Sequence, residues 1–101
     1  MALVNIESAV KKVLNALKKT PAGQGWEILS YKRNRGVAVI KEGDGTYWVR
    51  ERGYEEQQWQ VEERQLPRLL KSIVKREFPR SRTLRIYSVG KEDLDRKKKI
   101  L

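Results

Sequence analysis

The sequence predicts a single α+β domain in which a twisted antiparallel sheet packs against two helices. Two segments have apolar residues at three- and four-residue spacing, which is the pattern of an amphipathic helix. Short β-branched or aromatic runs, separated by glycines, lie between and after them. The chain has 101 residues, which suits one domain. We expect the order α-β-β-β-(β)-α-β over residues 1–90, followed by a charged, flexible C-terminal tail over residues 91–101.

The first helix is expected over residues 6–19. Asn5 suits its N-cap, and Thr20-Pro21 ends it, because proline disfavours a helical conformation in the residue before it. The apolar residues of this segment gather on one face of the helix, and they are Ile6, Ala9, Val10, Val13, Leu14 and Leu17.

A meander of strands is expected after the first helix. Its strands cover residues 26–33, 37–42 and 46–52, with a fourth at residues 54–61. Gly43-Asp44-Gly45 closes a hairpin, because glycine reaches the positive φ that a tight reversal needs. Since strands joined by tight turns run antiparallel, one face of the sheet can be buried while the other remains in water.

The second helix is expected over residues 66–78 and a last strand over residues 83–89. Pro67 fits the first turn of this helix but not its interior, and Pro79 ends it. The apolar stripe of the helix consists of Leu66, Leu69, Leu70, Ile73, Val74 and Phe78.

The composition excludes several kinds of active site. The chain has no cysteine and no histidine, which excludes disulfides, thiolate nucleophiles, zinc sites and most catalytic triads. The acidic pairs Glu42 with Asp44, and Glu55 with Glu56, are adjacent in turns or strands, where carboxylates are usually just solvated. No phosphate-binding loop of the Walker type is present. We therefore expect a protein that is not an enzyme and that uses no cofactor and no metal.

The expected location is the cytoplasm. No segment is long and apolar enough to span a membrane, and the N-terminus lacks the pattern of a secretory signal. The absence of cysteine agrees with a reducing compartment. Binding to a membrane surface is not expected, because neither helix has aromatic residues opposite its lysines.

The basic residues are unevenly distributed in a chain whose net charge is +10. Eight of them lie from Arg64 to Arg85, where only Glu77 opposes them. Cationic groups along a helix flank can follow a phosphate backbone without reading bases. The residues predicted to contact phosphate are Arg68, Lys71, Lys75, Arg76, Arg80 and Arg82. The alternatives are a solvated helix flank that binds nothing, or pairing with an acidic block made of Glu55, Glu56, Glu62 and Glu63.

The third expected strand alternates rings with charged side chains. Strand geometry places Trp48, Arg50 and Arg52 on one side, and Tyr47, Val49 and Glu51 on the other. An open face that mixes aromatics with arginine suits single-stranded nucleic acid, since bases stack on rings while arginines hold phosphates. The candidates for this face are Tyr31, Arg33, Trp48, Arg50, Arg52, Tyr54, Trp59, Arg85 and Tyr87. The alternative is that the rings are buried in the core or in a dimer interface, and Trp59, in a polar run, is expected to be more exposed than Trp48.

The order of elements resembles two groups of nucleic-acid-binding domains. Helix, three strands and helix is similar to the order in double-stranded RNA-binding domains. Here the corresponding helix opens LPRLLKSIVK, without their lysine cluster, and the chain has no histidine for their Gly-Pro-x-His loop. A four-strand meander followed by a helix is similar to Whirly and PUR-type single-strand binders in element order. Neither resemblance carries a motif, so no residue is transferred from it.

The leading hypothesis is a small, basic domain that binds the phosphate backbone of nucleic acid without catalysis. The rival is a protein-interaction module or a homodimer whose sheet face is the interface. The residues leave open whether the nucleic acid is DNA or RNA, and whether it is single- or double-stranded.

Overall fold

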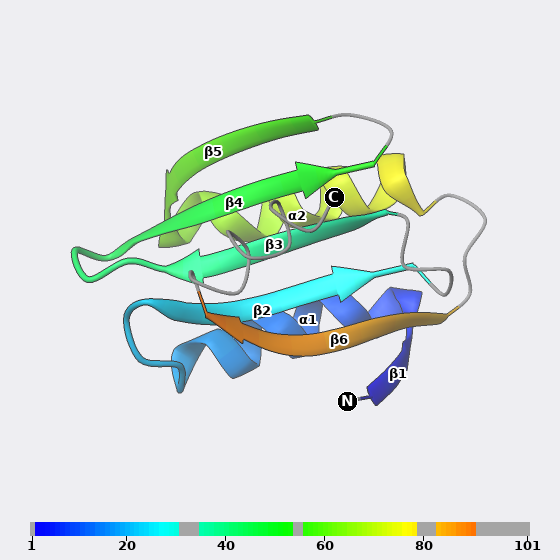
Figure 1. Ribbon diagram of the computed structural model, residues 1–101, viewed down its shortest axis with the longest axis horizontal. Coiled ribbons are helices and arrows are strands. Elements are labelled where there is room, and N and C mark those ends of the chain that lie inside the picture. Colours follow the sequence, from blue (N-terminus) through cyan, green and yellow to red (C-terminus); the bar gives the residue numbers. More distant parts are fainter. Residues whose placement is uncertain (1, 31–34, 54–55, 79–82, 91–101) are drawn as a thin grey trace.

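The computed structural model describes residues 2–30, 35–53, 56–78 and 83–90 (Figure 1). Its elements are β1 (Ala2–Asn5), α1 (Ile6–Lys18), β2 (Gln24–Leu29), β3 (Gly36–Lys41), β4 (Thr46–Arg52), β5 (Glu56–Glu62), the short 3-10 helix η1 (Glu63–Gln65), α2 (Leu66–Glu77) and β6 (Thr83–Gly90). The predicted fold class, an α+β domain with an antiparallel sheet and two helices, is confirmed. The expected tail, residues 91–101, lies outside the described residues.

The sheet has the strand order β1-β6-β2-β3-β4-β5, and every neighbouring pair is antiparallel. Strands β2 to β5 form the expected meander. The last strand, β6, returns to pair with the free edge of β2, and β1 then pairs with β6.

Strand β1 was not predicted from the sequence. It covers four residues, and Asn5, expected only as a helix N-cap, is its last residue and pairs with Thr83. So short an edge strand shows no alternation that could identify it, and its pairing partners lie about eighty residues further along the chain.

The C-terminal end of α1 is tied to the sheet by side chains. The Thr20 hydroxyl donates to the Ala16 carbonyl at 2.7 Å and accepts from Trp26 Nε1 at 3.0 Å. Lys41 Nζ donates to the Leu17 carbonyl at 3.1 Å, which places a cation where the helix dipole favours one. These contacts fix the end of α1 against β2 and β3.

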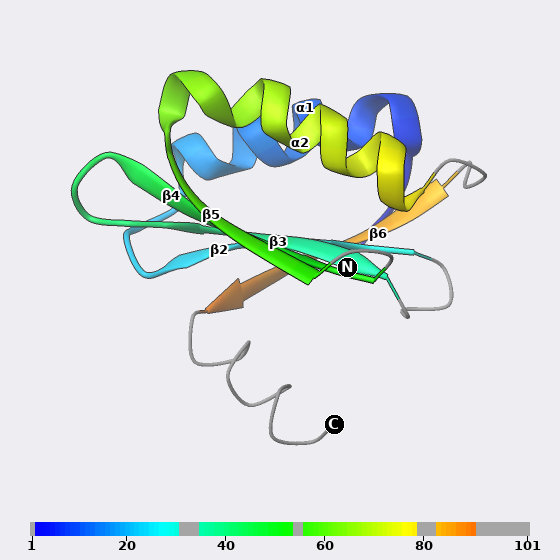
Figure 2. The same ribbon diagram turned by 90° about the horizontal axis from the view of Figure 1, so that it is seen from above.

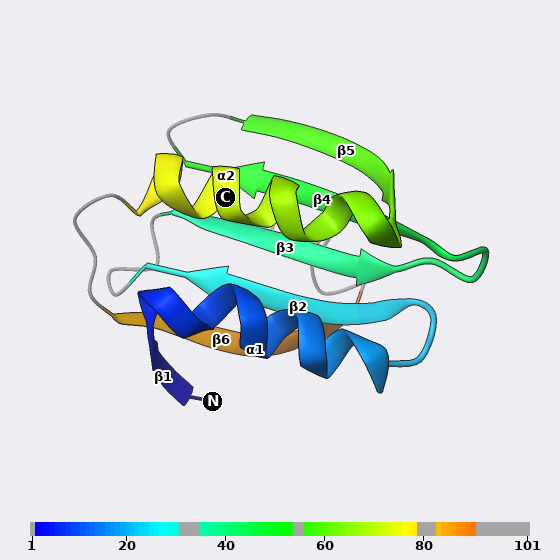
Figure 3. The ribbon, with the colours of Figure 1, turned by 180° about the vertical axis from the view of Figure 1, so that it is seen from behind.

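The two helices lie on the same face of the sheet, as Figure 2 shows. They run antiparallel and side by side (Figure 3). The core between helices and sheet contains Val13, Leu17, Ile28, Val39, Val49, Leu70, Ile73, Phe78 and Leu84, all nearly inaccessible to solvent. The inward side of β4 is the predicted one, with Tyr47, Val49 and Glu51 buried. No helix in the described part of the chain is long and apolar enough to cross a membrane.

Candidate functional site

The sheet surface opposite α1 and α2, which we call the helix-free face, brings together five predicted site residues. Strand register places Arg50 opposite Ala38, Arg52 opposite Gly36, and Trp48 opposite Ile40. The same register continues through β2 to β6, so the residues on this face are Trp48, Arg50 and Arg52 from β4 and Arg85 and Tyr87 from β6. Tyr31, Arg33 and Tyr54, predicted for the same face, lie outside the described residues.

Trp48 is half-buried on the helix-free face. Its ring packs against a small apolar cluster of Ala38, Ile40 and Val89, which are themselves shielded from solvent. The indole Nε1 donates to Gln58 Oε1 at 3.0 Å. Part of this ring is therefore covered by its own sheet.

Trp59 lies on the other face of the sheet, which corrects its assignment to the stacking surface. It stands opposite Val49 and packs against the core under the helices. Trp59 and Trp48 are both half-buried. The polar neighbours of Trp59 face water from an edge strand, while Trp59 and Val61 turn inward, so local polarity was a misleading guide.

Arg50 and Arg52 have an unusual environment on the helix-free face. Their Nη1 atoms are shielded from solvent, and within the described structure neither has a hydrogen-bond acceptor. Glu56 stands opposite Arg52 in the register, yet the described residues show no ion pair between them. A shielded donor without an acceptor is costly, so the Nη1 atom of each guanidinium group is not satisfied by the described part of the fold.

The outer side of the helix layer, which we call the helical surface, is strongly basic. Its exposed cations are Lys11, Lys12 and Lys18 from α1 and Arg68, Lys71 and Lys75 from α2. Within the described structure none of the six forms an ion pair. The α2 residues were predicted as phosphate contacts. The α1 lysines were not predicted as phosphate contacts, although the helical pattern of the sequence already places them on the polar side of that amphipathic helix.

Arg76, also predicted to contact phosphate, is instead held by Glu51 in β4. Its Nε and Nη2 donate to the two carboxylate oxygens at 2.9 and 2.6 Å. The Glu51 side chain is 0% exposed and that of Arg76 is 34% exposed. Arg76 therefore stabilises the fold and does not stand with the six unpaired cations. Arg80 and Arg82 lie outside the described residues.

The buried carboxylate of Glu51 has a second acidic neighbour. Burial raises the pKa of Glu51 above its usual value of 4.5, and a hydrogen bond with the Glu77 side chain adds to the rise, while the Arg76 guanidinium opposes it. Glu77 is also buried, and its backbone carbonyl accepts from Arg35 Nη1 at 3.3 Å. The Glu51 and Glu77 side chains are therefore both shielded from solvent, between β4 and the C-terminal end of α2.

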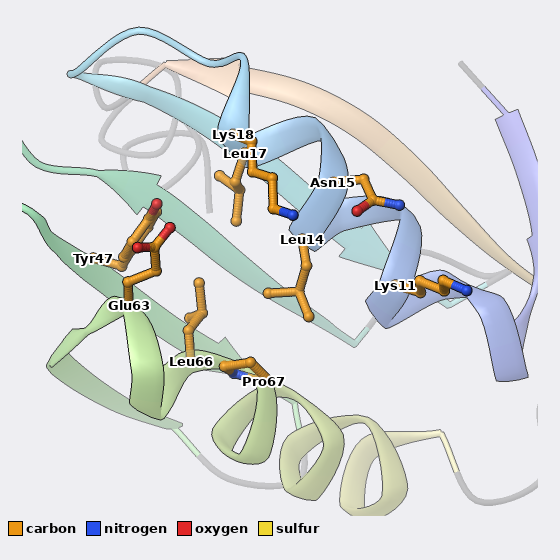
Figure 4. A pocket seen from close by; sticks show the side chains of 9 residues that line it. All are labelled: Lys11, Leu14, Asn15, Leu17, Lys18, Tyr47, Glu63, Leu66 and Pro67. Atoms are coloured by element: carbon orange, nitrogen blue, oxygen red, sulfur yellow. The ribbon is translucent and has the colours of Figure 1, made fainter.

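A groove of about 320 Å³ separates the C-terminal half of α1 from the start of α2 (Figure 4). Its lining consists of Lys11, Leu14, Asn15, Leu17, Lys18, Tyr47, Glu63, Leu66 and Pro67. Burial raises the pKa of the Tyr47 phenol, and the charge of Glu63 adds to this. The groove places an apolar floor between lysines of the helical surface.

The described residues contain no group of three or more acidic, histidine or cysteine side chains that could hold a metal ion. Comparison of the chain with protein-family models, with curated proteins and with solved structures found no match.

Proposed function

We propose that this protein binds nucleic acid without catalysis, through phosphate contacts on the helical surface. One observation supports the proposal above all others: six exposed cations on two antiparallel helices have no ionic partner among the described residues. Cations that neutralise phosphates release condensed counterions, which supplies most of the free energy of binding that is independent of sequence.

The pairing of α1 with α2 strengthens the argument drawn from one helix flank. Arg68, Lys71 and Lys75 alone would form a narrow row, as on many solvated helices. The lysines of α1 widen this row into a surface, because the two helices lie side by side (Figure 3). Long, mobile ammonium groups on such a surface suit a backbone that is bound in many registers.

The rival function, a protein-interaction module or a homodimer joined through the sheet, has weaker support. An interface of that kind gains its stability from apolar area that is exposed in the free chain. On the helix-free face Ala38, Ile40 and Val89 are already shielded, which leaves them little area to bury against a partner. We propose that the protein acts in the cytoplasm, because a chain without cysteine has no disulfides that would need an oxidising compartment.

The test is the salt dependence of binding, measured by fluorescence anisotropy with single- and double-stranded oligonucleotides of DNA and RNA. Each lost phosphate contact lowers the slope of log K against log salt by about 0.9 for duplex DNA. The variant Lys71→Gln should therefore bind more weakly and show that smaller slope. Arg64→Gln is the matched control, because it removes the same charge from an exposed side chain that pairs with Glu62 at 3.4 Å.

Two results would refute the proposal. One is the absence of binding to all four nucleic acids at low salt and micromolar protein. The other is an equal loss of affinity in Lys71→Gln and Arg64→Gln, because only total charge would then matter.

A further inference from the structure

Arg50 and Arg52 occupy alternate positions of β4, so both point to the helix-free face. Alternate residues of a strand are about 6.6 Å apart, which is similar to the step between successive phosphates of an extended nucleic-acid strand. Trp48 precedes them on the same face of the same strand. Strand β4 therefore presents a ring and two guanidinium groups in one line.

The two arginines are poised to accept an anionic ligand. Their Nη1 donors are shielded from water and have no acceptor within the described structure, while each side chain as a whole is half-buried. Because each Nη1 already lacks a hydrogen bond in the free protein, the arginine gives up fewer hydrogen bonds when its side chain turns outward. A phosphate oxygen supplies the missing acceptor in a charge-assisted bond, and the planar group can contact it with two donors.

We propose that Arg50 and Arg52 form a second phosphate-binding subsite, on the helix-free face, which takes the backbone of single-stranded nucleic acid. The inference rests on the proposed function, and it adds a substrate class that the helical surface does not distinguish. The selection comes from Trp48, since the bases of a duplex are stacked inside and cannot meet a ring on the protein. An unpaired strand can place a base against the exposed part of that ring while its phosphates follow the two arginines.

Acidic groups on this face limit where the strand runs. Glu27 in β2 is buried and pairs with Ala38 of β3, which in turn pairs with Arg50. Glu56 in β5 is exposed and stands opposite Arg52. The exposed Glu56 carboxylate repels phosphate, so the favourable path follows β4 itself, with the arginines facing the backbone. Gln58 and Gln60, opposite Arg50 and Trp48, add neutral amides beside this path.

The experiment compares Arg50→Gln/Arg52→Gln with Lys71→Gln in binding oligothymidylate and a DNA duplex. The double variant should lose at least about tenfold in affinity for the single strand, as expected when a charge-assisted bond is removed. Its affinity for the duplex should change by less than about twofold, while Lys71→Gln weakens both ligands alike. Thermal melting checks the fold of each variant. Arg50→Lys/Arg52→Lys keeps the charge but not the planar donors, so its affinity for the single strand should lie between those of the wild type and Arg50→Gln/Arg52→Gln.

The outcomes separate this inference from the proposed function. Unchanged single-strand binding in the double variant, with weaker binding in Lys71→Gln, overturns the subsite alone. Equal loss for both ligands in the double variant also overturns it, because single strands would then not be selected. A titration with inorganic tripolyphosphate, followed by NMR of the arginine side chains, remains possible when no nucleic acid binds. A response of Arg50 and Arg52 there supports the anion subsite but refutes nucleic acid as its ligand, and no response refutes both. A dimer that dissociates in the double variant would instead show a protein interface.

Discussion

The ion pair between Arg76 and Glu51 is the part of the charge pattern that should matter for folding rather than binding. The test is Arg76→Met, which keeps most of the aliphatic stem and removes only the guanidinium. The variant leaves the Glu51 carboxylate, which is 0% exposed, without its two hydrogen bonds at 2.6 and 2.9 Å. We expect a clear loss of stability.

The magnitude follows from the burial of the two partners. Removing one partner of a fully buried pair costs about 3–5 kcal/mol. Because the Arg76 side chain is 34% exposed, water screens part of the interaction. We therefore expect the free energy of unfolding to fall by about 2–3 kcal/mol. Neutralising the carboxylate as well, in Arg76→Met/Glu51→Gln, should recover part of that loss, because no buried charge then remains unpaired.

Urea denaturation followed by tryptophan fluorescence measures these free energies. The wild type, Arg76→Met, Glu51→Gln and Arg76→Met/Glu51→Gln form a double-mutant cycle. Lys75→Met is the control, since Lys75 is the exposed neighbour of Arg76 on α2 and should change stability by less than about 0.5 kcal/mol. The interpretation fails if Arg76→Met is no more destabilising than Lys75→Met. It also fails if the losses from the Arg76 and Glu51 substitutions simply add.

Two further predictions concern stability. Since the pKa of Glu51 is raised in the fold, its contribution to stability is complete below about pH 4.5 and is lost as pH rises through the folded-state pKa. The variant Glu77→Gln removes one cause of the rise, so its stability, measured in urea from about pH 4 to pH 8, should decline less than that of the wild type; parallel curves would show that Glu77 does not raise the pKa of Glu51. A Cβ on Gly25 would overlap the backbone carbonyl of Val39, so Gly25→Ala should lower the free energy of unfolding by more than about 3 kcal/mol and lower the thermal midpoint with it. In Gly43→Ala the new Cβ would meet only Ala22 Cβ, at 3.9 Å, so this variant should be nearly neutral, and similar midpoints for the two variants would contradict the prediction.

Most elements of the fold were predictable because their signals are local. The limits of β4 over residues 46–52 agree with the sequence, and those of α1 and α2 agree to within one residue at each end. The first strand of the meander was placed too late, since it starts at Gln24 and ends at Leu29. Just after its end, the Ser30 amide donates to the Arg35 carbonyl at 3.0 Å. A hydrogen bond between residues five positions apart leaves no trace in strand propensity.

The site was less predictable because it depends on which residues meet across the fold. Period-two alternation correctly grouped Trp48, Arg50 and Arg52 along one strand. The ion pair that removes Arg76 from the phosphate-binding candidates joins it to Glu51, 25 positions away. Helix periodicity cannot reveal such a contact. One signal was available, namely that Glu51 shares a side with Tyr47 and Val49. An acid on the inward side of a strand needs a cation from the element that covers it.

The one-sided arrangement of helices gives this small domain two cationic surfaces of different character, and β5 separates them along one edge. The helical surface carries flexible, unpaired cations, mostly lysines, while the helix-free face carries guanidinium groups beside a ring. The edge strand has exposed acids at both ends, Glu56 and Glu62, and Glu63 follows in η1. A phosphate backbone that turned over this edge would meet those carboxylates at close range. We therefore expect that a strand bound to one face would not continue across β5 onto the other. If both surfaces bind, the two contacts are separate events, and each face should be tested on its own.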